Sequence, residues 1–426
     1  MGRGELSSLD AGVATDRFGL DVTVGAPDSI GEWDRAIREA QDFRGEPGDR
    51  LALVTEADGA FVMGLVVTLT GTILGGDDPT AASTRDDFDA LIDRSKAATR
   101  RERDHVAAVA ALVAGQHTEA AERWEKVGAC HAHDMVATRS AHEVYLHVGD
   151  DARRLRSSEA TLARLVPGDP GFGVAAGQHA FALEEVGRLD EAERHARLAL
   201  EVDPVDVWAL HALAHVYETQ GRTAESITFL RGSRSDWIER DHLALHLEWH
   251  LALRLLAAGE VDECLALVDE RLPETDRAFG LADLTSLLWR LELAGHDVGD
   301  RWSGVAAKWR DHAQLHTTGF LDLHAALAFS ACPDAPGAGA FWDGLEACHR
   351  DGASQNARTF DEVVRPLAAA VRDHRTGCHD RAAAAIAGLA ADIHRVGGSH
   401  AQRDLFARTG AESRRLVDPP STWSHA

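Results

Sequence analysis

Paired cysteines, lysines and long apolar runs are scarce in this chain of 426 residues, and each shortage excludes a class of protein. The five cysteines are odd in number, scattered and never in a C-x-x-C spacing, which argues against a disulfide framework or a thiolate zinc site. We therefore expect reduced thiols and a cytoplasmic location. The longest apolar run, residues 61–74, is too short to cross a bilayer, and the N-terminus lacks the apolar core of a secretory signal.

Positive charge is also in short supply. The chain has 44 Lys and Arg against 69 Asp and Glu, a net charge of −25, and only three of the positive residues are lysines. Such a balance repels phosphate backbones and anionic membranes, so we expect no nucleic-acid and no membrane partner. The glycine-rich nucleotide signatures and the G-x-S-x-G of serine hydrolases are missing, which removes sequence support for both chemistries.

What the chain does contain is a regularly repeated glycine between two helical segments. Successive spacings are 34, 38, 34, 38 and 36 residues, at Gly115, Gly149, Gly187, Gly221, Gly259 and Gly295. A period near 34 is typical of tetratricopeptide repeats, in which each unit is a helix–turn–helix pair. Glycine supplies the left-handed conformation that ends the first helix, and strand-like alternation is almost absent. The pattern predicts an all-α fold, a right-handed α-solenoid of tetratricopeptide-like helix pairs.

The pattern also predicts how the chain is divided. We expect a flexible N-terminus over 1–29, an N-terminal helical cap over 30–98, repeats over 99–331, C-terminal helical repeats that close the solenoid over 332–416, and a tail over 417–426. Within the first hundred residues we expect helices over 30–43, 52–74 and 86–96, with a turn or linker at 47–50.

Histidines are the most informative polar residues, and several recur every four residues on expected helices. They are His211 and His215, followed by Glu218, and then His242, His246 and His250, with Trp249 beside the last. Residues three or four apart share one helix face, and the first helix of each repeat lines the concave surface. Two such helices could gather four imidazoles and a carboxylate, which suits Zn, Fe, Mn or Cu, or a proton relay.

A structural role for these histidines stays open, because pairs at this spacing also arise by chance in a chain with 23 His, and no H-E-x-x-H is present. Two other stretches are singled out. Residues 99–105 place three arginines around Glu102, as in a solvated helix start or an anion clamp. Residues 131–134, His-Ala-His-Asp, are metal-like in composition but fall in an expected loop.

From residue 30 to 409 the chain resembles the family of tetratricopeptide repeat protein thirty-eight and its bacterial relatives. The resemblance rests on FVMG (61–64), TRRERDHV (99–106), AHEVYLHVG (141–149), WALHALAHVYETQGR (208–222), DHLALHLEWHLAL (241–253) and GGSHAQRDLF (397–406). The His-x-x-x-His and Gly-Gly-Ser-x-Ala-Gln-Arg-Asp segments are the specific ones, because ordinary tetratricopeptide repeats lack them. We identify the chain as a bacterial member of this family.

The resemblance implies no established activity, but it places a set of polar residues on family motif positions. They are His142, Tyr145, His211, His215, Glu218, His246, His250, Asp322, His324, Gln402, Arg403 and Asp404. Such residues are costly to bury unless paired, so the resemblance implies a solenoid curled around a central polar pocket.

The chain departs from the family pattern at Leu247, Glu248 and Leu321, and at His179, six residues before Glu185. If these positions line the pocket, this member acts on a different substrate, as an enzyme of specialised metabolism would, or has lost activity.

Two functions follow from the sequence. The first is a small-molecule binder, leaning towards an enzyme, with acid–base or metal-assisted chemistry on a small polar substrate. Its catalytic or metal-binding residues are His211, His215, His246 and His250 with Glu218, and its cofactor is a divalent Zn, Fe or Mn ion. Its substrate-binding residues are His142, Tyr145, Glu185, Trp249, Asp322, His324, Arg403 and Asp404. In this hypothesis Arg403 pairs with Asp404 or binds a substrate carboxylate.

The second function is a non-catalytic adaptor that holds a peptide or protein partner in the concave groove. The near absence of lysine disfavours a clamp for a peptide carboxylate without excluding other peptide modes. A homodimer is expected in either case, since an exposed solenoid end often dimerises.

Overall fold

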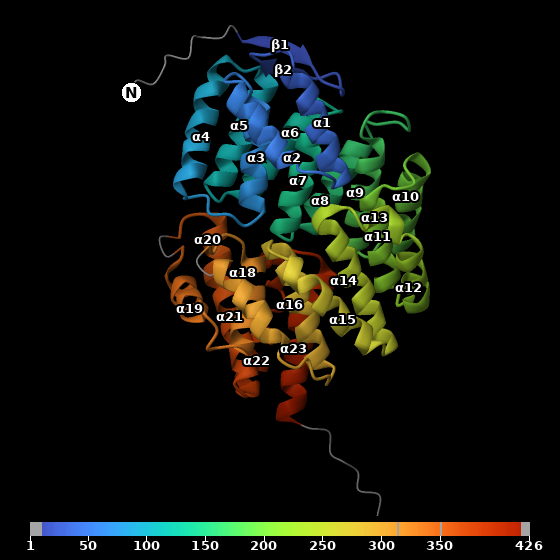
Figure 1. Ribbon diagram of the computed structural model, residues 1–426, viewed down its shortest axis with the longest axis vertical. Helices are drawn as coiled ribbons and strands as arrows, with labels where there is room; N and C mark the ends of the chain where they lie inside the picture. The colour runs from blue at the N-terminus through green and yellow to red at the C-terminus, as the bar shows by residue number, and fades with distance from the viewer. Residues whose placement is uncertain (1–10, 313–314, 350–351, 419–426) are drawn as a thin grey trace, which may run out of the picture. The chain divides into compact units, whose positions relative to one another are not determined.

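The computed structural model describes residues 11–312, 315–349 and 352–418, without the side chains of residues 241 and 242 (Figure 1). Its regular structure is almost entirely helical, which confirms the all-α prediction. The chain forms two compact units. Unit 1 comprises Met1–Tyr145, Asp151–Leu213 and Asp236–Asp241, and unit 2 comprises Leu146–Asp150, Ala214–Ser235 and His242–Ala426, within the described residues. The chain therefore passes between the units five times, in places within a helix.

The elements up to the middle of the chain begin with one antiparallel hairpin, β1 (Gly12–Thr15) and β2 (Asp21–Val24), in which Gly12 is opposite Val24. The helices that follow are α1 (Ser29–Asp42), α2 (Pro47–Ala57), α3 (Val62–Leu74), α4 (Ala82–Arg94), η1 (Ser95–Ala97), α5 (Arg100–Val113), α6 (His117–Cys130), α7 (Met135–His147), α8 (Asp151–Leu162), α9 (Phe172–Glu185), α10 (Leu189–Val202), α11 (Val207–Thr219), α12 (Thr223–Gly232) and α13 (Arg234–Trp237).

The second half continues in the same way. Its helices are α14 (Asp241–Ala258), α15 (Val261–Arg271), η2 (Leu272–Glu274), α16 (Ala278–Leu293), α17 (Arg301–Trp309), η3 (Arg310–His312), α18 (Gly319–Ala331), α19 (Ala338–Ala347), α20 (Gln355–Thr359), the π-helical turn η4 (Phe360–Val364), α21 (Arg365–Arg375), α22 (His379–Leu389), η5 (Ile393–Val396) and α23 (His400–Val417). No described helix combines the length and the apolar character that a membrane crossing requires.

The repeated glycines lie where the sequence predicted, between the two helices of successive pairs from α5–α6 to α16–α17. All six have a positive φ, from 65° to 86°, which is the left-handed conformation that ends a helix. Gly377, with φ 79°, does the same between α21 and α22. At Gly149 a Cβ atom would also lie 1.8 Å from the carbonyl oxygen of His394, so glycine is needed there for close approach. This succession of helix pairs is consistent with an α-solenoid.

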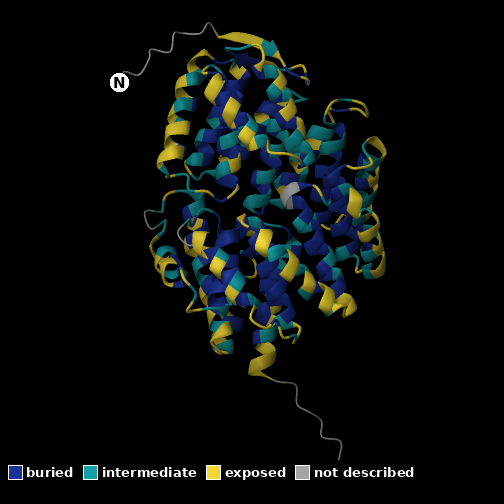
Figure 2. Cartoon of the chain, in the orientation of Figure 1, coloured by how far each residue is buried: buried dark blue, intermediate teal, exposed yellow. Residues whose placement is uncertain are grey.

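Burial separates inner from outer helices. In Figure 2 the central helices α16 and α18 are dark blue along most of their length, whereas α4 shows exposed residues over most of its surface. The core of unit 2 includes the apolar side chains of α16 and α18, with Trp289 on α16, and also Trp302 and Trp309 on α17. Polar residues on an inner helix are therefore surrounded by protein.

The stretch expected to be a flexible N-terminus, 1–29, contains the hairpin β1–β2. Glu102 anchors β2, because its carboxylate accepts the N–H of Thr23 at 2.9 Å and its hydroxyl at 2.5 Å. Two other expectations for the first hundred residues are wrong. The expected helix over 52–74 is two helices, α2 and α3. Asp58 separates them, and its carboxylate accepts the hydroxyl of Ser29 at 2.6 Å. Residues 47–50 form the first turn of α2 rather than a linker. Residues 1–10 and 419–426 lie outside the described part.

Candidate functional site

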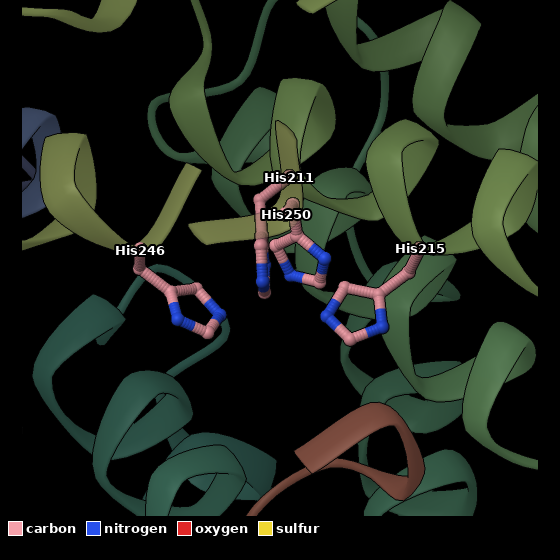
Figure 3. A group of neighbouring side chains, drawn as sticks. All are labelled: His211, His215, His246 and His250. Carbon is pink, nitrogen blue, oxygen red and sulfur yellow. The ribbon is translucent and has the colours of Figure 1, made fainter. Parts of the chain in front are cut away.

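The four histidines of the predicted site come together. One ligand atom from each of His211, His215, His246 and His250 lies within 4.8 Å of the others, and Figure 3 shows the rings gathered around one space. Helix α11 carries the first two and α14 the last two. The boundary between the units falls inside α11, and this continuous helix places His211 one turn before His215, which lies in unit 2 with the other pair. We call these four residues the histidine cluster.

Ring packing fixes the cluster from within. The rings of His215 and His250 lie 4.4 Å apart at 68°, and those of His246 and His250 lie 4.8 Å apart at 78°. Trp249 stacks on His246 at 5.2 Å with an angle of 15° between the planes. His215 and His250 are almost completely buried, and Trp249 is 1% exposed. The tryptophan, which was predicted to bind substrate, therefore covers one side of the cluster.

Two of the four imidazoles are held by carboxylates. His250 Nδ1 lies 2.9 Å from Glu218 Oε2, and His246 Nδ1 lies 3.0 Å from Asp283 Oδ2 on α16. An ionised carboxylate only accepts, so Nδ1 of each ring carries a proton, and in the neutral tautomer Nε2 has the lone pair. Metal-binding histidines are usually oriented in this way. The sequence predicted Glu218 from its spacing on α11, but no pattern linked Asp283 to the cluster.

Electrostatics favour neutral imidazole at this place. Burial lowers the pKa of His250 well below its ordinary value, and the positive charge of Arg254 acts in the same direction. Burial raises the pKa of Glu218, while Arg254, whose Nη2 lies 2.9 Å from Glu218 Oε1, opposes that rise. His250 therefore keeps a lone pair on its ring at neutral pH, and Arg254 balances the carboxylate that orients it.

The C-terminal helix α23 is tied to the cluster's surroundings by Arg290 on α16. Arg290 is buried, pairs with Asp404 at 2.5 Å, and donates a hydrogen bond to the carbonyl oxygen of Ala401 at 2.7 Å. Its guanidinium carbon lies 5.8 Å from the Trp249 ring. At the start of α23 the His400 ring lies 6.1 Å from that of His215. The first turn of α23 is thereby fixed beside His215.

Of the two roles predicted for Arg403, pairing with Asp404 is not observed, and binding of a substrate carboxylate stays a prediction. Asp404 pairs with Arg290 and with Arg408, since both guanidinium groups approach it on its own side of α23. Arg403 donates a hydrogen bond to the carbonyl oxygen of Gly398. Gln402, another motif position, closes the capping box at the start of α23.

Asp322 and His324 on α18, which were predicted to bind substrate, have partners within the protein. Asp322 pairs with His316 Nδ1 at 2.5 Å. His324 donates from Nδ1 to the carbonyl oxygen of Phe320 at 2.8 Å, and burial lowers its pKa to about 4. Asp322 is therefore not among the groups that hold the histidine cluster.

Besides His211, three predicted residues belong to unit 1. His142 on α7 packs against Phe181 and Trp208, with ring centroids 6.1 Å and 5.8 Å away. Burial lowers the pKa of His142 well below its ordinary value. Tyr145 is buried on the same helix, and a carboxylate oxygen of Glu185 lies 3.8 Å from Arg154 Nη2. These residues lie on helices α7 to α9, before the helix that carries His211.

The departures from the family pattern on α14 do not hold the cluster. Glu248 pairs with Arg271 at 2.6 Å and with Arg234 at 2.7 Å, and Leu247 is completely buried. Leu321 is 7% exposed and belongs to the apolar core of unit 2. His179 lies 3.0 Å from the Ser158 hydroxyl.

The arginine-rich segment 99–105 is a helix start, as expected, but only one face of it is solvated, where Arg100, Arg103 and Asp104 are exposed. Arg101 and His105 are buried on Asp134, the last residue of the His-Ala-His-Asp loop, at 2.7 Å and 2.9 Å. Thr99 and Glu102 form the capping box of α5. Buried charges need partners, and Asp134 of the segment 131–134 is the partner of Arg101 and His105 in the segment 99–105.

An open pocket also lies in unit 1 between α1 and α2, lined among others by Glu32, Glu46, Arg50, Leu53 and Asp58. None of the predicted site residues lines it. A search against models of known protein families finds no match for this chain, so its resemblance to the tetratricopeptide repeat protein thirty-eight family stays a hypothesis.

Proposed function

We propose that this protein binds a divalent transition-metal ion through the histidine cluster and uses it in chemistry on a small polar substrate. The observation that supports this most strongly is the pair of carboxylates on Nδ1 of His246 and His250. Structural histidines of this chain, such as His105 and His316, also pair with carboxylates. Here, however, two rings oriented in this way belong to one cluster of four imidazoles, where a metal site gains in ring orientation and ligand basicity. Family membership, the right-handed course of the solenoid and a central pocket are parts of the same proposal.

The donor set narrows the choice of metal. Imidazole nitrogen suits Zn, Cu, Fe and Ni, whereas Mn prefers carboxylate and carbonyl oxygen, so we favour Zn or Fe over Mn. When bound, such an ion polarises a substrate oxygen or lowers the pKa of a bound water to about 7. His215, His246 and His250 alone match the three-histidine set of catalytic zinc sites, and adding His211 would complete a closed tetrahedral site.

The surrounding residues have separate tasks in this function. Glu218 and Asp283 keep the proton on Nδ1 of their histidines, and Arg254 balances the charge of Glu218. Trp249 shields the His246 ring from water on one side. These residues orient the ligands without being ligands, so their loss should weaken metal binding rather than abolish it.

Elemental analysis of tag-free protein purified without chelator tests the proposal. Wild type should carry close to one Zn or Fe per chain, and a His211→Ala/His250→Ala variant should carry almost none. The matched control is His374→Ala/His379→Ala, another pair of neighbouring histidines in unit 2, with ring centroids 5.4 Å apart. That control should keep its metal.

Absence of metal from wild type, also after incubation with Zn²⁺ or Fe²⁺, would overturn the proposal and favour the adaptor with a peptide partner. The metal content of the single His211→Ala variant shows whether three or four histidines bind the metal. Retained metal would mean three ligands and an open position, as catalysis requires, whereas lost metal would mean a closed site.

A further inference from the structure

The open pocket between α1 and α2 belongs to unit 1 and takes no part in the proposed metal chemistry. Its volume of about 510 Å³ falls within the range of about 300–1,000 Å³ that is usual for small-molecule sites. Leu53, Val54 and Ala57, on one face of α2, contribute apolar side chains to its lining. Leu53 is 68% exposed, more than any other large apolar side chain of the described residues. A molecule with an apolar body would remove this side chain from water.

The charged groups of the lining are mostly negative. Five carboxylates and one guanidinium, that of Arg50, contribute to it. Arg50 pairs with Glu32 and with Glu39, each at 2.8 Å, and Arg35 pairs with Glu32 at 3.2 Å. Because these two guanidinium groups and two carboxylates cancel, the lining keeps no positive charge to balance its other carboxylates.

Those other carboxylates differ in what already holds them. Asp58 accepts the hydroxyl of Ser29, and Arg94 balances its charge from close by, with Nη1 at 3.2 Å from the Asp58 carbonyl oxygen. Asp28 and Asp49 are exposed and pair with no cation in the part of the chain that the structure describes. These two carboxylates therefore remain available to a ligand in the pocket.

The helix dipoles offset only part of this charge. Asp28 directly precedes α1 and makes no cap hydrogen bond with its side chain, and Asp49 lies in the first turn of α2. The N-terminus of a helix carries about half a positive charge, so the two helix starts together offset about one of the two negative charges. An excess of negative charge thus remains beside an apolar wall.

We infer that this pocket binds a small aliphatic amine in its protonated form. The ammonium group donates to the carboxylates of Asp28 and Asp49, and the hydrocarbon chain covers Leu53. This site goes beyond the proposed function and does not depend on the histidine cluster. The pocket could not be predicted, because the sequence pattern indicates a turn or linker at 47–50, where α2 begins.

Calorimetric titration of the full chain with hexylamine at neutral pH and low ionic strength tests the inference, with 1-hexanol as the uncharged analogue. Hexylamine should bind, and 1-hexanol should bind about tenfold more weakly. Asp28→Asn/Asp49→Asn should weaken hexylamine binding about tenfold, because exposed ion pairs contribute modestly. The matched control is Glu56→Gln/Asp104→Asn, which removes two exposed charges of unit 1 that do not line the pocket. It should keep the affinity of the wild type.

Equal affinity for hexylamine in the two double variants would overturn the inference. Equal binding of hexylamine and 1-hexanol, or no binding of hexylamine at millimolar concentration, would do the same. Tighter binding of a lysine-containing peptide than of hexylamine would overturn the assignment to a small molecule. All four substituted residues lie outside the histidine cluster, so coordination of the amine to a metal cannot cause a difference between the variants. A failure of metal binding therefore leaves this test intact, and the reverse also holds.

Discussion

Replacing Glu218 with Gln would remove one buried negative charge while keeping the shape of the side chain. In the wild type this carboxylate accepts from His250 Nδ1 and from Arg254 Nη2, both at 2.9 Å. An amide has one oxygen, so Glu218→Gln keeps one of the two acceptors and turns a donor towards the other partner. The partner that faces the amide nitrogen loses its acceptor and the other keeps only an uncharged one, so both His250 and Arg254 are held less firmly.

The two losses have different magnitudes and different readouts. Loss of an orienting carboxylate lowers metal affinity about 10-fold to 100-fold, which corresponds to about 1.4–2.7 kcal/mol. Loss of a charged hydrogen bond to the largely buried Arg254 lowers the free energy of unfolding of the metal-free protein by about 1–3 kcal/mol. We expect both effects in Glu218→Gln.

Competition for Zn²⁺ with a chromophoric chelator measures the first effect, and urea unfolding of metal-free protein measures the second. The matched control is Glu248→Gln on α14, which removes the same charge from a carboxylate that is 3% exposed and paired with two arginines. It should lose stability and keep metal affinity. Equal metal affinity in wild type, Glu218→Gln and Glu248→Gln would refute the reasoning. Glu218 would then have only a structural role, in which it holds α11 against α14.

Three further predictions concern stability. Burial lowers the pKa of His324 to about 4, so as the pH falls the unfolded chain binds a proton at this residue before the folded protein does. The free energy of unfolding should therefore fall by about 3 kcal/mol between pH 6.5 and pH 4. Urea unfolding of His324→Gln should show a smaller fall over the same range. Gly187→Ala, with open space around a φ of 78°, should cost about 1–2 kcal/mol in thermal melts. Gly149→Ala should cost clearly more, because its Cβ would collide with the His394 carbonyl; equal costs would contradict this. Asp134→Asn should lower the free energy of unfolding by about 3–5 kcal/mol, because it leaves a buried Arg101 without its charge partner, and metal content should stay unchanged.

The helix pairs could be predicted because their signal is local. Glycine at the end of a first helix acts through its own backbone, and the 3.6-residue period of apolar side chains identifies the helices on either side. The hairpin β1–β2 could not be predicted, because its strands have four residues each and Glu102, far along the chain, anchors Thr23. Likewise the apolar pattern of residues 52–74 hides the break that Asp58 makes through contacts with Gly25 and Ser29.

The site shows the same division between local and distant information. Spacing on one helix places His211 with His215 and His246 with His250, and the repeat period brings α11 and α14 together. The carboxylate on His246 could not be predicted, because Asp283 lies 37 residues from His246 and belongs to no motif. Motif membership also misled, because Asp322 pairs with His316 and not with the cluster.

Synthesis of the chain on the ribosome gives the close approach at Gly149 a consequence for the order of folding. The end of α7 and the following turn, Leu146–Asp150, belong to unit 2 and meet residues near its C-terminus. A Cβ on Gly149 would collide with His394, and one on Gly397 would lie 2.5 Å from the carbonyl oxygen of His147. About 245 residues must be added after Gly149 before this contact can form. The turn after α7 therefore lacks this contact until the last helices are made, and truncation before residue 394 would leave Gly149 and the His147 carbonyl without it.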